Sequence, residues 1–202
     1  MPEPEARRAG RGAASAKAFA VVILTAVAVF ALDQWSKYLI TENFAVGERV
    51  SVLGEVLHFV FVKNSGAAFS LAAGWTWIFS IVATGVAVFI AWFAPRIRST
   101  VWMLVFGMLL GGTLGNLADR LFREPSFGLG HVVDFIQVWG FPAIFNVADI
   151  FIVSSMGLFI LLTILGISLD GTRARSSAST GSDGAPAGAA NEAESPSASP
   201  GT

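Results

Sequence analysis

Four long apolar stretches dominate the hydropathy pattern of the chain and predict four membrane-spanning helices. Each stretch has roughly the 20 residues that an α-helix needs to cross the hydrocarbon core of a bilayer. The predicted spans cover residues 18–40, 70–93, 100–118 and 146–169. A polar, basic segment precedes them at 1–17, and a segment rich in Ser, Ala, Gly and Pro follows at 170–202. We expect both end segments to be disordered, because they contain too few apolar residues to fold.

The segments between the spans predict the topology. Lys and Arg gather in residues 1–17, in the turn 94–99 and just after the last span. Because basic residues stay on the cytoplasmic side, both termini are expected inside the cell. Two larger loops, 41–69 and 119–145, then lie outside. The first of them carries β-branched and aromatic runs broken by a glycine, which predicts a small hairpin or curved sheet.

The first apolar stretch also fits a second interpretation. A basic start, an apolar run and the small residues Ala-Val-Ala at 26–28 are typical of a cleaved secretory signal. However, the apolar run continues beyond that point and three further spans follow it. A retained transmembrane helix is therefore the favoured interpretation.

Composition strengthens the membrane assignment and narrows the chemistry. The chain is 54% hydrophobic and only 13% charged, against about 25% charged residues in a soluble domain. Its net charge of −1 offers no basic surface for nucleic acid. There is no Cys, and the only histidines are His58 and His131. Thiol nucleophiles, Cys-ligated metals and a His-rich zinc site are thus excluded, and we expect neither a metal nor a cofactor.

Carboxylates are the remaining candidates for chemistry. Four of the six aspartates lie at or near the outer ends of the predicted spans: Asp33, Asp119, Asp134 and Asp149. Carboxylates at membrane depth are costly and usually functional. Simpler roles stay open, since Asp149 could cap a helix, Asp119 could pair with Arg120, and Asp33 could accept hydrogen bonds. Asp134 does not fit a turn, because its neighbours in Val-Val-Asp-Phe-Ile are strand-like.

Two carboxyl groups without a His or Cys partner suit two classes of protein. In an aspartic peptidase the pair shares one proton, so that one carboxylate activates water and the other protonates the scissile carbonyl. In a proton-coupled transporter, single carboxylates relay protons. The middles of the last three spans contain only Ser and Thr as polar groups, so no path across the membrane is evident. Composition alone leaves both classes open.

Five motifs decide between the classes. In order they are Asp-Gln-Trp-Ser-Lys at 33–37, Asn-Ser-Gly-Ala-Ala-Phe-Ser at 64–70, Gly-Gly-Thr-Leu-Gly-Asn-Leu-Ala-Asp-Arg at 111–120, Val-Val-Asp-Phe at 132–135 and Phe-Asn-Val-Ala-Asp at 145–149. Together they closely resemble the bacterial lipoprotein signal peptidases, or signal peptidase II, over about residues 20–168. The resemblance implies an all-α membrane protein with four transmembrane helices and a small extracytoplasmic β-cradle in the first outer loop.

The same resemblance implies an activity. It is that of an inner-membrane aspartic endopeptidase which removes the signal peptide from diacylglyceryl-modified prolipoproteins, cutting just before the lipidated Cys. The implied catalytic pair is Asp134 and Asp149. The implied support and substrate-binding residues are Asp33, Lys37, Asn64, Gly112, Asn116, Asp119, Arg120, Asn146 and Ala148. The expected partners are prolipoproteins and membrane lipids, and we expect a monomer.

Departures from the family pattern concern geometry more than chemistry. Ser36 stands where Thr is common, and Ile150 follows the last aspartate where Ser is common. The segment between the two implied catalytic residues is short. Because Asp149 is predicted at a helix amino terminus, whose dipole favours an anion, we expect it to be the more acidic partner. Asp134 would then carry the shared proton.

Overall fold

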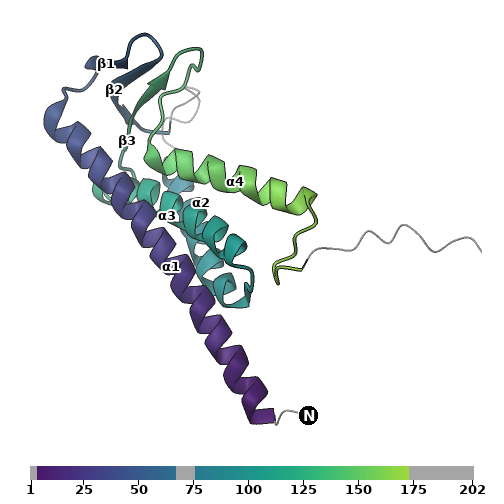
Figure 1. Cartoon of the computed structure of the whole chain (residues 1–202). Helices are drawn as coiled ribbons and strands as arrows, with labels where there is room; N and C mark the ends of the chain where they lie inside the picture. Colours follow the sequence, from purple (N-terminus) through teal and green to yellow (C-terminus); the bar gives the residue numbers. More distant parts are fainter. Residues whose placement is uncertain (1–3, 67–75, 173–202) are drawn as a thin grey trace, which may run out of the picture.

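Helices traverse the length of the molecule and a small sheet covers one end of them (Figure 1). The computed structural model describes residues 4–66 and 76–172. The helices are α1 (Pro4–Asn43), α2 (Thr76–Phe93), the short 3₁₀ helix η1 (Ala94–Arg96), α3 (Thr100–Phe122) and α4 (Val147–Ile164). Within the described residues, four helices are long and apolar enough to cross a membrane. The predicted four-helix membrane fold is therefore confirmed.

The ends of these helices differ from the predicted spans. The helix α1 begins at Pro4, so most of the segment predicted to be disordered is helical. Proline is well tolerated in the first turn of a helix, and the Ala, Arg and Lys residues that follow favour helix formation. The helix α3 continues one turn beyond residue 118, to Phe122. The predicted start of the second span, at residue 70, lies outside the described residues.

The last helix is shorter than predicted: α4 ends at Ile164, whereas the predicted span continued to residue 169. The chain turns there through Gly166, whose φ of 65° is a left-handed conformation that glycine adopts without strain. The N–H of Gly166 donates to the carbonyl of Thr163 at 3.1 Å and closes the final turn. Residues after 164 therefore form a compact turn, and those beyond 172 lie outside the described part of the chain.

Three antiparallel strands form the sheet in the order β1–β2–β3. They are β1 (Arg49–Leu53), β2 (Leu57–Asn64) and β3 (Val132–Val138). The first two make the hairpin predicted for the first outer loop. The third strand comes from the second outer loop, and in its register Val62 lies opposite Asp134. The cradle is thus built from both loops, and Asp134 lies in a strand, as its apolar neighbours indicated.

Glycines on α3 allow α1 and α4 to approach its backbone. A Cβ atom on Gly111 would lie 2.6 Å from the carbonyl oxygen of Ala26 on α1. A Cβ atom on Gly112 would lie 2.6 Å from the carbonyl oxygen of Ala148 on α4. Small residues permit such close helix packing in membranes. Gly112 and Ala148, both implied support residues, therefore act by bringing α4 against α3.

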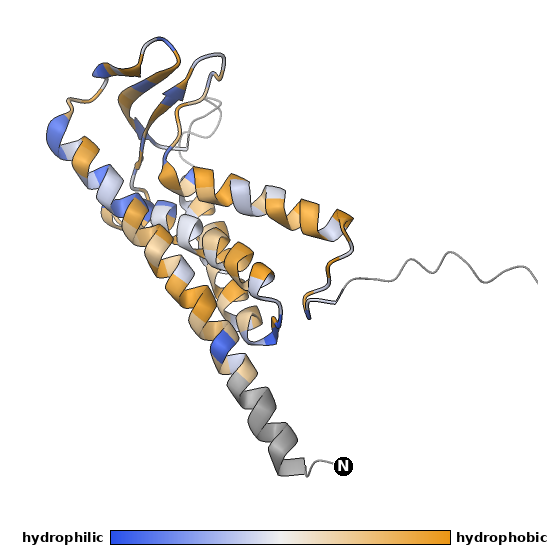
Figure 2. Ribbon diagram, in the orientation of Figure 1, coloured by the Kyte–Doolittle hydropathy of each residue, from blue (hydrophilic) through white to orange (hydrophobic). Residues whose placement is uncertain are grey.

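Hydrophobic residues cover the middle of the helices, while hydrophilic residues gather near the end of α1 that carries the sheet (Figure 2). The main apolar core joins α1, α2, α3 and the end of α4. A second apolar cluster packs the sheet onto the end of α1 through Ile40, Phe61, Val133 and Phe135. The sheet therefore lies over the ends of α1, α3 and α4. The buried side chains of Asp33, Lys37 and Asp119 meet in the same region.

Candidate active site

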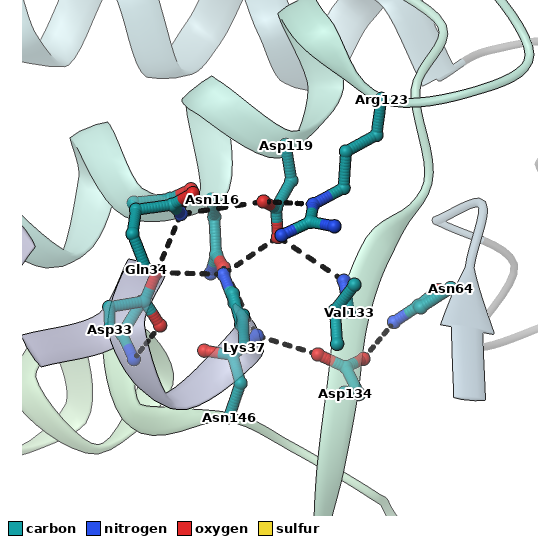
Figure 3. A network of polar contacts seen from close by, with 12 residues as sticks. Asp33, Gln34, Lys37, Asn64, Asn116, Asp119, Arg123, Val133, Asp134 and Asn146 are labelled. Carbon is teal, nitrogen blue, oxygen red and sulfur yellow. Dashed lines mark hydrogen bonds and ion pairs between the residues drawn. The ribbon is translucent and has the colours of Figure 1, made fainter. Parts of the chain in front are cut away.

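Asp134 lies in the middle of β3 with its carboxyl buried, at 3% exposure. Two amides hold it: Asn64 Nδ2 donates to Oδ2 at 2.7 Å, and Asn146 Nδ2 donates to Oδ1 at 2.6 Å (Figure 3). Burial raises the pKa of Asp134 to about 6. The hydrogen bond from Asn64 opposes this rise, and the negative charge of Asp149 adds to it. Asp134 therefore keeps a proton at a pH where an ordinary carboxyl has lost it.

Asp149 lies in the first turn of α4, where a capping box holds it. Asn146 is the N-cap, and its Oδ1 accepts a hydrogen bond from the Asp149 N–H at 3.0 Å. In return, Asp149 Oδ2 accepts from the Asn146 N–H at 3.2 Å. The second oxygen, Oδ1, accepts from Asn116 Nδ2 at 2.7 Å. Asp149 is thus not the cap itself, as was considered, but the third-residue partner of the Asn146 cap, and its other carboxylate oxygen is directed to α3.

The amides of Asn116 and Asn146 connect the two carboxyl groups. Asn146 Nδ2 donates both to Asp134 and to Asn116 Oδ1, the latter at 3.1 Å. Asn116 Nδ2 then donates to Asp149. The pair is thereby held by amide donors that carry no charge, while the positive charges of Lys37 and Arg120 act on it without a direct ion pair in the described residues. Such an arrangement suits two carboxyls that share one proton.

A fully buried lysine supports this network from α1. The side chain of Lys37 is 0% exposed, and its Nζ lies 2.8 Å from a carboxylate oxygen of both Asp33 and Asp119. It also donates to Asn116 Oδ1 at 3.0 Å. Lys37 thereby determines which way the Asn116 amide faces, because the oxygen is held on the lysine and the nitrogen must point to Asp149. The lysine acts on the carboxyl pair through Asn116.

The two aspartates beside Lys37 tie further elements to the network. Asp33 Oδ1 accepts from the N–H of Ala148 at 2.9 Å, which satisfies a donor in the first turn of α4. Asp119 accepts from the N–H of Val133 on β3 at 3.2 Å and from Arg123 Nε at 2.6 Å. These bonds position the two segments that carry the carboxyl pair. They connect α1 to α4 and α3 to β3.

The ion pair considered between Asp119 and Arg120 was wrong. Asp119 pairs with Lys37 and with Arg123, which lies four residues further along α3. Successive residues on a helix point in different directions, whereas residues four apart share a face. Because the predicted span stopped at residue 118, the helical spacing of Asp119 and Arg123 was not visible.

Arg120 makes no ion pair with Asp119, but the charges of Asp134, Asp149 and Asp119 all act on its guanidinium. Its guanidinium carbon lies 5.1 Å from the centroid of the Phe79 ring on α2. Its Nη1 is buried and has no hydrogen-bond partner within residues 4–66 and 76–172. A Cβ atom on Gly66, next to the Asn64 turn, would lie 3.6 Å from this nitrogen. Arg120 is therefore a buried donor beside the segment that holds Asp134.

Comparison with known proteins gives the family. A family model described as "Signal peptidase (SPase) II" matches residues 25–165. The chain belongs to the signal peptidase II family. It is 53% identical over 186 residues to a "Lipoprotein signal peptidase" of Leifsonia xyli subsp. xyli (strain CTCB07), covering 92% of this chain and 86% of that one. It is 43% identical over 150 residues to a protein of the same name from Mycobacterium bovis (strain BCG / Pasteur 1173P2), covering 74% of each.

Solved structures agree with the membrane fold. Two structures titled as a bacterial membrane enzyme by the in meso method, at 2.3 and 1.9 Å resolution, share 29% identity with this chain. Both have a TM-score of 0.62 and cover 71% of this chain, with 87% and 92% of their own chains matched. As a member of the signal peptidase II family the chain is a protease. This confirms the peptidase interpretation over the transporter alternative.

Two residues of this candidate site were missed in the sequence. Gln34 Nε2 donates to Asp33 Oδ2 and to the carbonyl of Gly115, both at 3.1 Å. Arg123 neutralises Asp119 from the solvent side. The position of Gln34 inside the first motif, and the four-residue spacing of Asp119 and Arg123, were the available signals. In the described part of the chain, no group of three or more His, Asp or Glu is arranged to hold a metal.

Proposed function

We propose that this protease is an aspartic lipoprotein signal peptidase with Asp134 and Asp149 as its catalytic pair. The substrate is a diacylglyceryl-modified prolipoprotein, cleaved just before the lipidated Cys. The observation that carries the proposal is the linkage of the two carboxyls through the Asn116 and Asn146 amides, over the ends of three apolar helices. The substrate class is supported by the relatives, which are named lipoprotein signal peptidases.

The chemistry follows from the different surroundings of the two carboxyls. Asp149, at the amino terminus of α4, takes a proton from a water molecule, since the helix dipole favours negative charge there. The water oxygen then bonds to the scissile carbonyl carbon while Asp134, whose pKa is raised, gives its proton to the carbonyl oxygen. In the second step the proton on Asp149 passes to the leaving nitrogen, the C–N bond breaks, and Asp134 takes back a proton from a hydroxyl of the tetrahedral intermediate as the carbonyl re-forms. One proton remains on the pair for the next cycle.

Neutral and cationic donors around the pair suit an extended peptide. Asn64 holds Asp134 and also accepts the N–H of Gly66 at 2.8 Å, which orders the chain next to the site. The Nη1 of Arg120, which has no hydrogen-bond partner among residues 4–66 and 76–172, is available for a carbonyl oxygen of the substrate. We assign Arg120 to substrate binding and Asn64 to holding Asp134. Asp33, Lys37, Asn116, Asp119 and Asn146 are positioning residues in this proposal.

The depth of the pair in the membrane suits a lipid-anchored substrate. The helices α1 and α3 run in the same direction. Gly107 packs on Val22 and Gly111 packs on Ala26, so residue numbers rise together along the contact. The sheet and the carboxyl pair consequently lie at the end opposite the Arg96 turn. With that basic turn on the cytoplasmic side, both termini are cytoplasmic and the site faces the outer surface. The acyl chains of the substrate stay in the bilayer while the scissile bond reaches the site.

The functional unit comprises the four membrane-spanning helices and the sheet. We propose residues 18–169 as the peptidase domain, acting as a monomer in the bilayer with lipids around it. Residues 170–202 are proposed to be dispensable for cleavage.

The decisive experiment is cleavage of a diacylglyceryl-modified prolipoprotein by the purified protein. Asp134→Asn and Asp149→Asn should each lower the rate by about 10²–10⁴-fold, the usual contribution of a general acid or base. Asp170→Asn is the matched control, because Asp170 is fully exposed in the turn after α4. Near-normal cleavage by either site variant would overturn the catalytic pair. Equal cleavage of the unmodified precursor would overturn the lipid requirement.

A further inference from the structure

Two hollows lie end to end along α1 and α3, away from the carboxyl pair. The first, which we call the outer hollow, has a volume of about 550 Å³ and lies between the end of α1, the end of α3 and the sheet. The second, the apolar groove, has a volume of about 440 Å³ and runs between the middle parts of α1 and α3. Phe122 lines both hollows, so the two adjoin at this residue.

The outer hollow is separated from the proposed active site by the sheet. Side chains alternate between the two faces of a strand. Val62 faces Asp134 across the β2–β3 pair, and the next pair along is Lys63 with Val133. Lys63 and Val133 line the outer hollow. A ligand there would therefore occupy the face of the sheet opposite the carboxyl pair.

The apolar groove has the dimensions of one leaflet of a bilayer. Its lining on α3 extends from Leu110 to Phe122, a rise of about 18 Å at about 1.5 Å per residue. Half of a hydrocarbon core measures about 15 Å. Every residue that lines the groove is apolar, including Val27 and Phe30 on α1. The groove thus matches a lipid acyl chain of the outer leaflet.

The outer hollow carries the charge that a lipid phosphate requires. Arg123 binds Asp119 through Nε, which leaves its terminal guanidinium nitrogens as further donors. Lys63 pairs with Glu124 at 3.1 Å, but their side chains are 43% and 85% exposed. Such an exposed pair is weak, so the ammonium can move to a competing anion. His131 is a further donor, and among the described residues that line the hollow Glu124 is the only acidic one.

We propose that this surface binds one anionic phospholipid of the outer leaflet. Its phosphate lies in the outer hollow against Arg123, Lys63 and His131, and one acyl chain lies in the apolar groove between α1 and α3. The bound lipid joins the ends of α1 and α3 to the sheet from the side opposite the carboxyl pair. This inference does not depend on the catalytic assignment, because the two surfaces are distinct.

Native mass spectrometry of the purified full-length chain in a neutral detergent tests the proposal. Phosphatidylglycerol and phosphatidylcholine with identical acyl chains are titrated in parallel, and the fraction of protein carrying one lipid is measured. Phosphatidylglycerol should bind about fivefold more tightly or better, since basic residues favour anionic headgroups. Equal affinities for the two lipids would overturn the headgroup assignment.

Matched variants locate the lipid. Lys63→Gln combined with His131→Gln should abolish the preference for phosphatidylglycerol, whereas Arg98→Gln, at the opposite end of the helices, should retain it. Val27→Trp fills the groove and should weaken the binding of both lipids. Leu24→Trp is its control, because Leu24 is 69% exposed on α1 but does not line the groove, while Val27 is 58% exposed. Unchanged binding by Val27→Trp would overturn the groove assignment.

A competition experiment separates a membrane lipid from the substrate's own acyl chains. A short peptide with a diacylglyceryl-modified Cys is added to the protein loaded with phosphatidylglycerol. Retention of the bound lipid supports the proposal. If the peptide displaces phosphatidylglycerol both from the wild type and from the variant carrying Lys63→Gln and His131→Gln, the groove receives the acyl chains of the substrate. That result would overturn the proposal. All these readouts measure lipid binding, so failure of the peptidase mechanism would not affect them.

Discussion

Replacing Lys37 with Met removes the one charge that is completely buried between two carboxylates. Lys37 Nζ lies 2.8 Å from Asp33 and 2.8 Å from Asp119, and all three side chains are 0% exposed. Methionine has a similar reach but offers no donor. The variant Lys37→Met therefore leaves the volume of the site nearly unchanged and withdraws the ammonium from both carboxylates and from the amide of Asn116.

Most of the lost stability should come from Asp33, which would be left as a buried carboxylate without a counter-charge. Asp119 keeps Arg123 as a counter-charge at 2.6 Å, whereas Asp33 keeps only neutral donors, from Ala148 and Gln34. Removing one partner of a buried ion pair destabilises a protein by about 3–5 kcal/mol. We expect Lys37→Met to lower the free energy of unfolding by that amount. Adding Asp33→Asn should restore about 1–3 kcal/mol, because a neutral amide needs no counter-charge.

Unfolding in mixed micelles with increasing sodium dodecyl sulfate, followed by circular dichroism, measures these free energies. Lys17→Met is the control, since Lys17 is exposed on the same helix and its loss should change stability by less than about 0.5 kcal/mol. A loss below about 1 kcal/mol for Lys37→Met would show that the two buried carboxylates do not depend on the ammonium. So would additive effects of the Lys37 and Asp33 substitutions, because residues in direct contact should show coupling.

Three further predictions concern the carboxyl pair and its surroundings. Because the pKa of Asp134 is raised to about 6 and its neutral form donates a proton, kcat/KM should fall as pH rises through that value; a profile that stays flat to about pH 8 would contradict this. Gly115→Ala should destabilise the protein by about 1–3 kcal/mol, since its Cβ would overlap the carboxylate of Asp33. The control Gly157→Ala, whose Cβ meets nothing within 4 Å, should be neutral or stabilising in the same unfolding assay. Arg120→Gln should lower kcat/KM by about 10–100-fold through a lost charged hydrogen bond to substrate, with little change in stability, because Nη1 has no partner within the described residues; full activity of this variant would contradict the assignment.

The hydrophobic pattern alone determined the four helices, because crossing a bilayer requires about 20 consecutive apolar residues whatever the neighbours are. Local sequence patterns also predicted the structural setting of Asp134 and Asp149. The spacing of Asn146 and Asp149 at the start of an apolar run is a capping box that forms within one helical turn. The strand-like neighbours of Asp134 indicated β-structure for the same local reason. Such features depend on residues only a few positions apart.

Tertiary structure decided which polar groups meet. Only the pairing of β2 with β3 places Asn64 beside Asp134, 70 positions later in the chain. Only the close packing of α1 on α3 brings Lys37 to Asn116 and Asp119, and only the extended α3 makes Arg123 the second partner of Asp119. The physical reason is that a buried charge takes whichever partner the folded backbone brings within hydrogen-bond reach. That distance is not encoded by adjacency in the sequence.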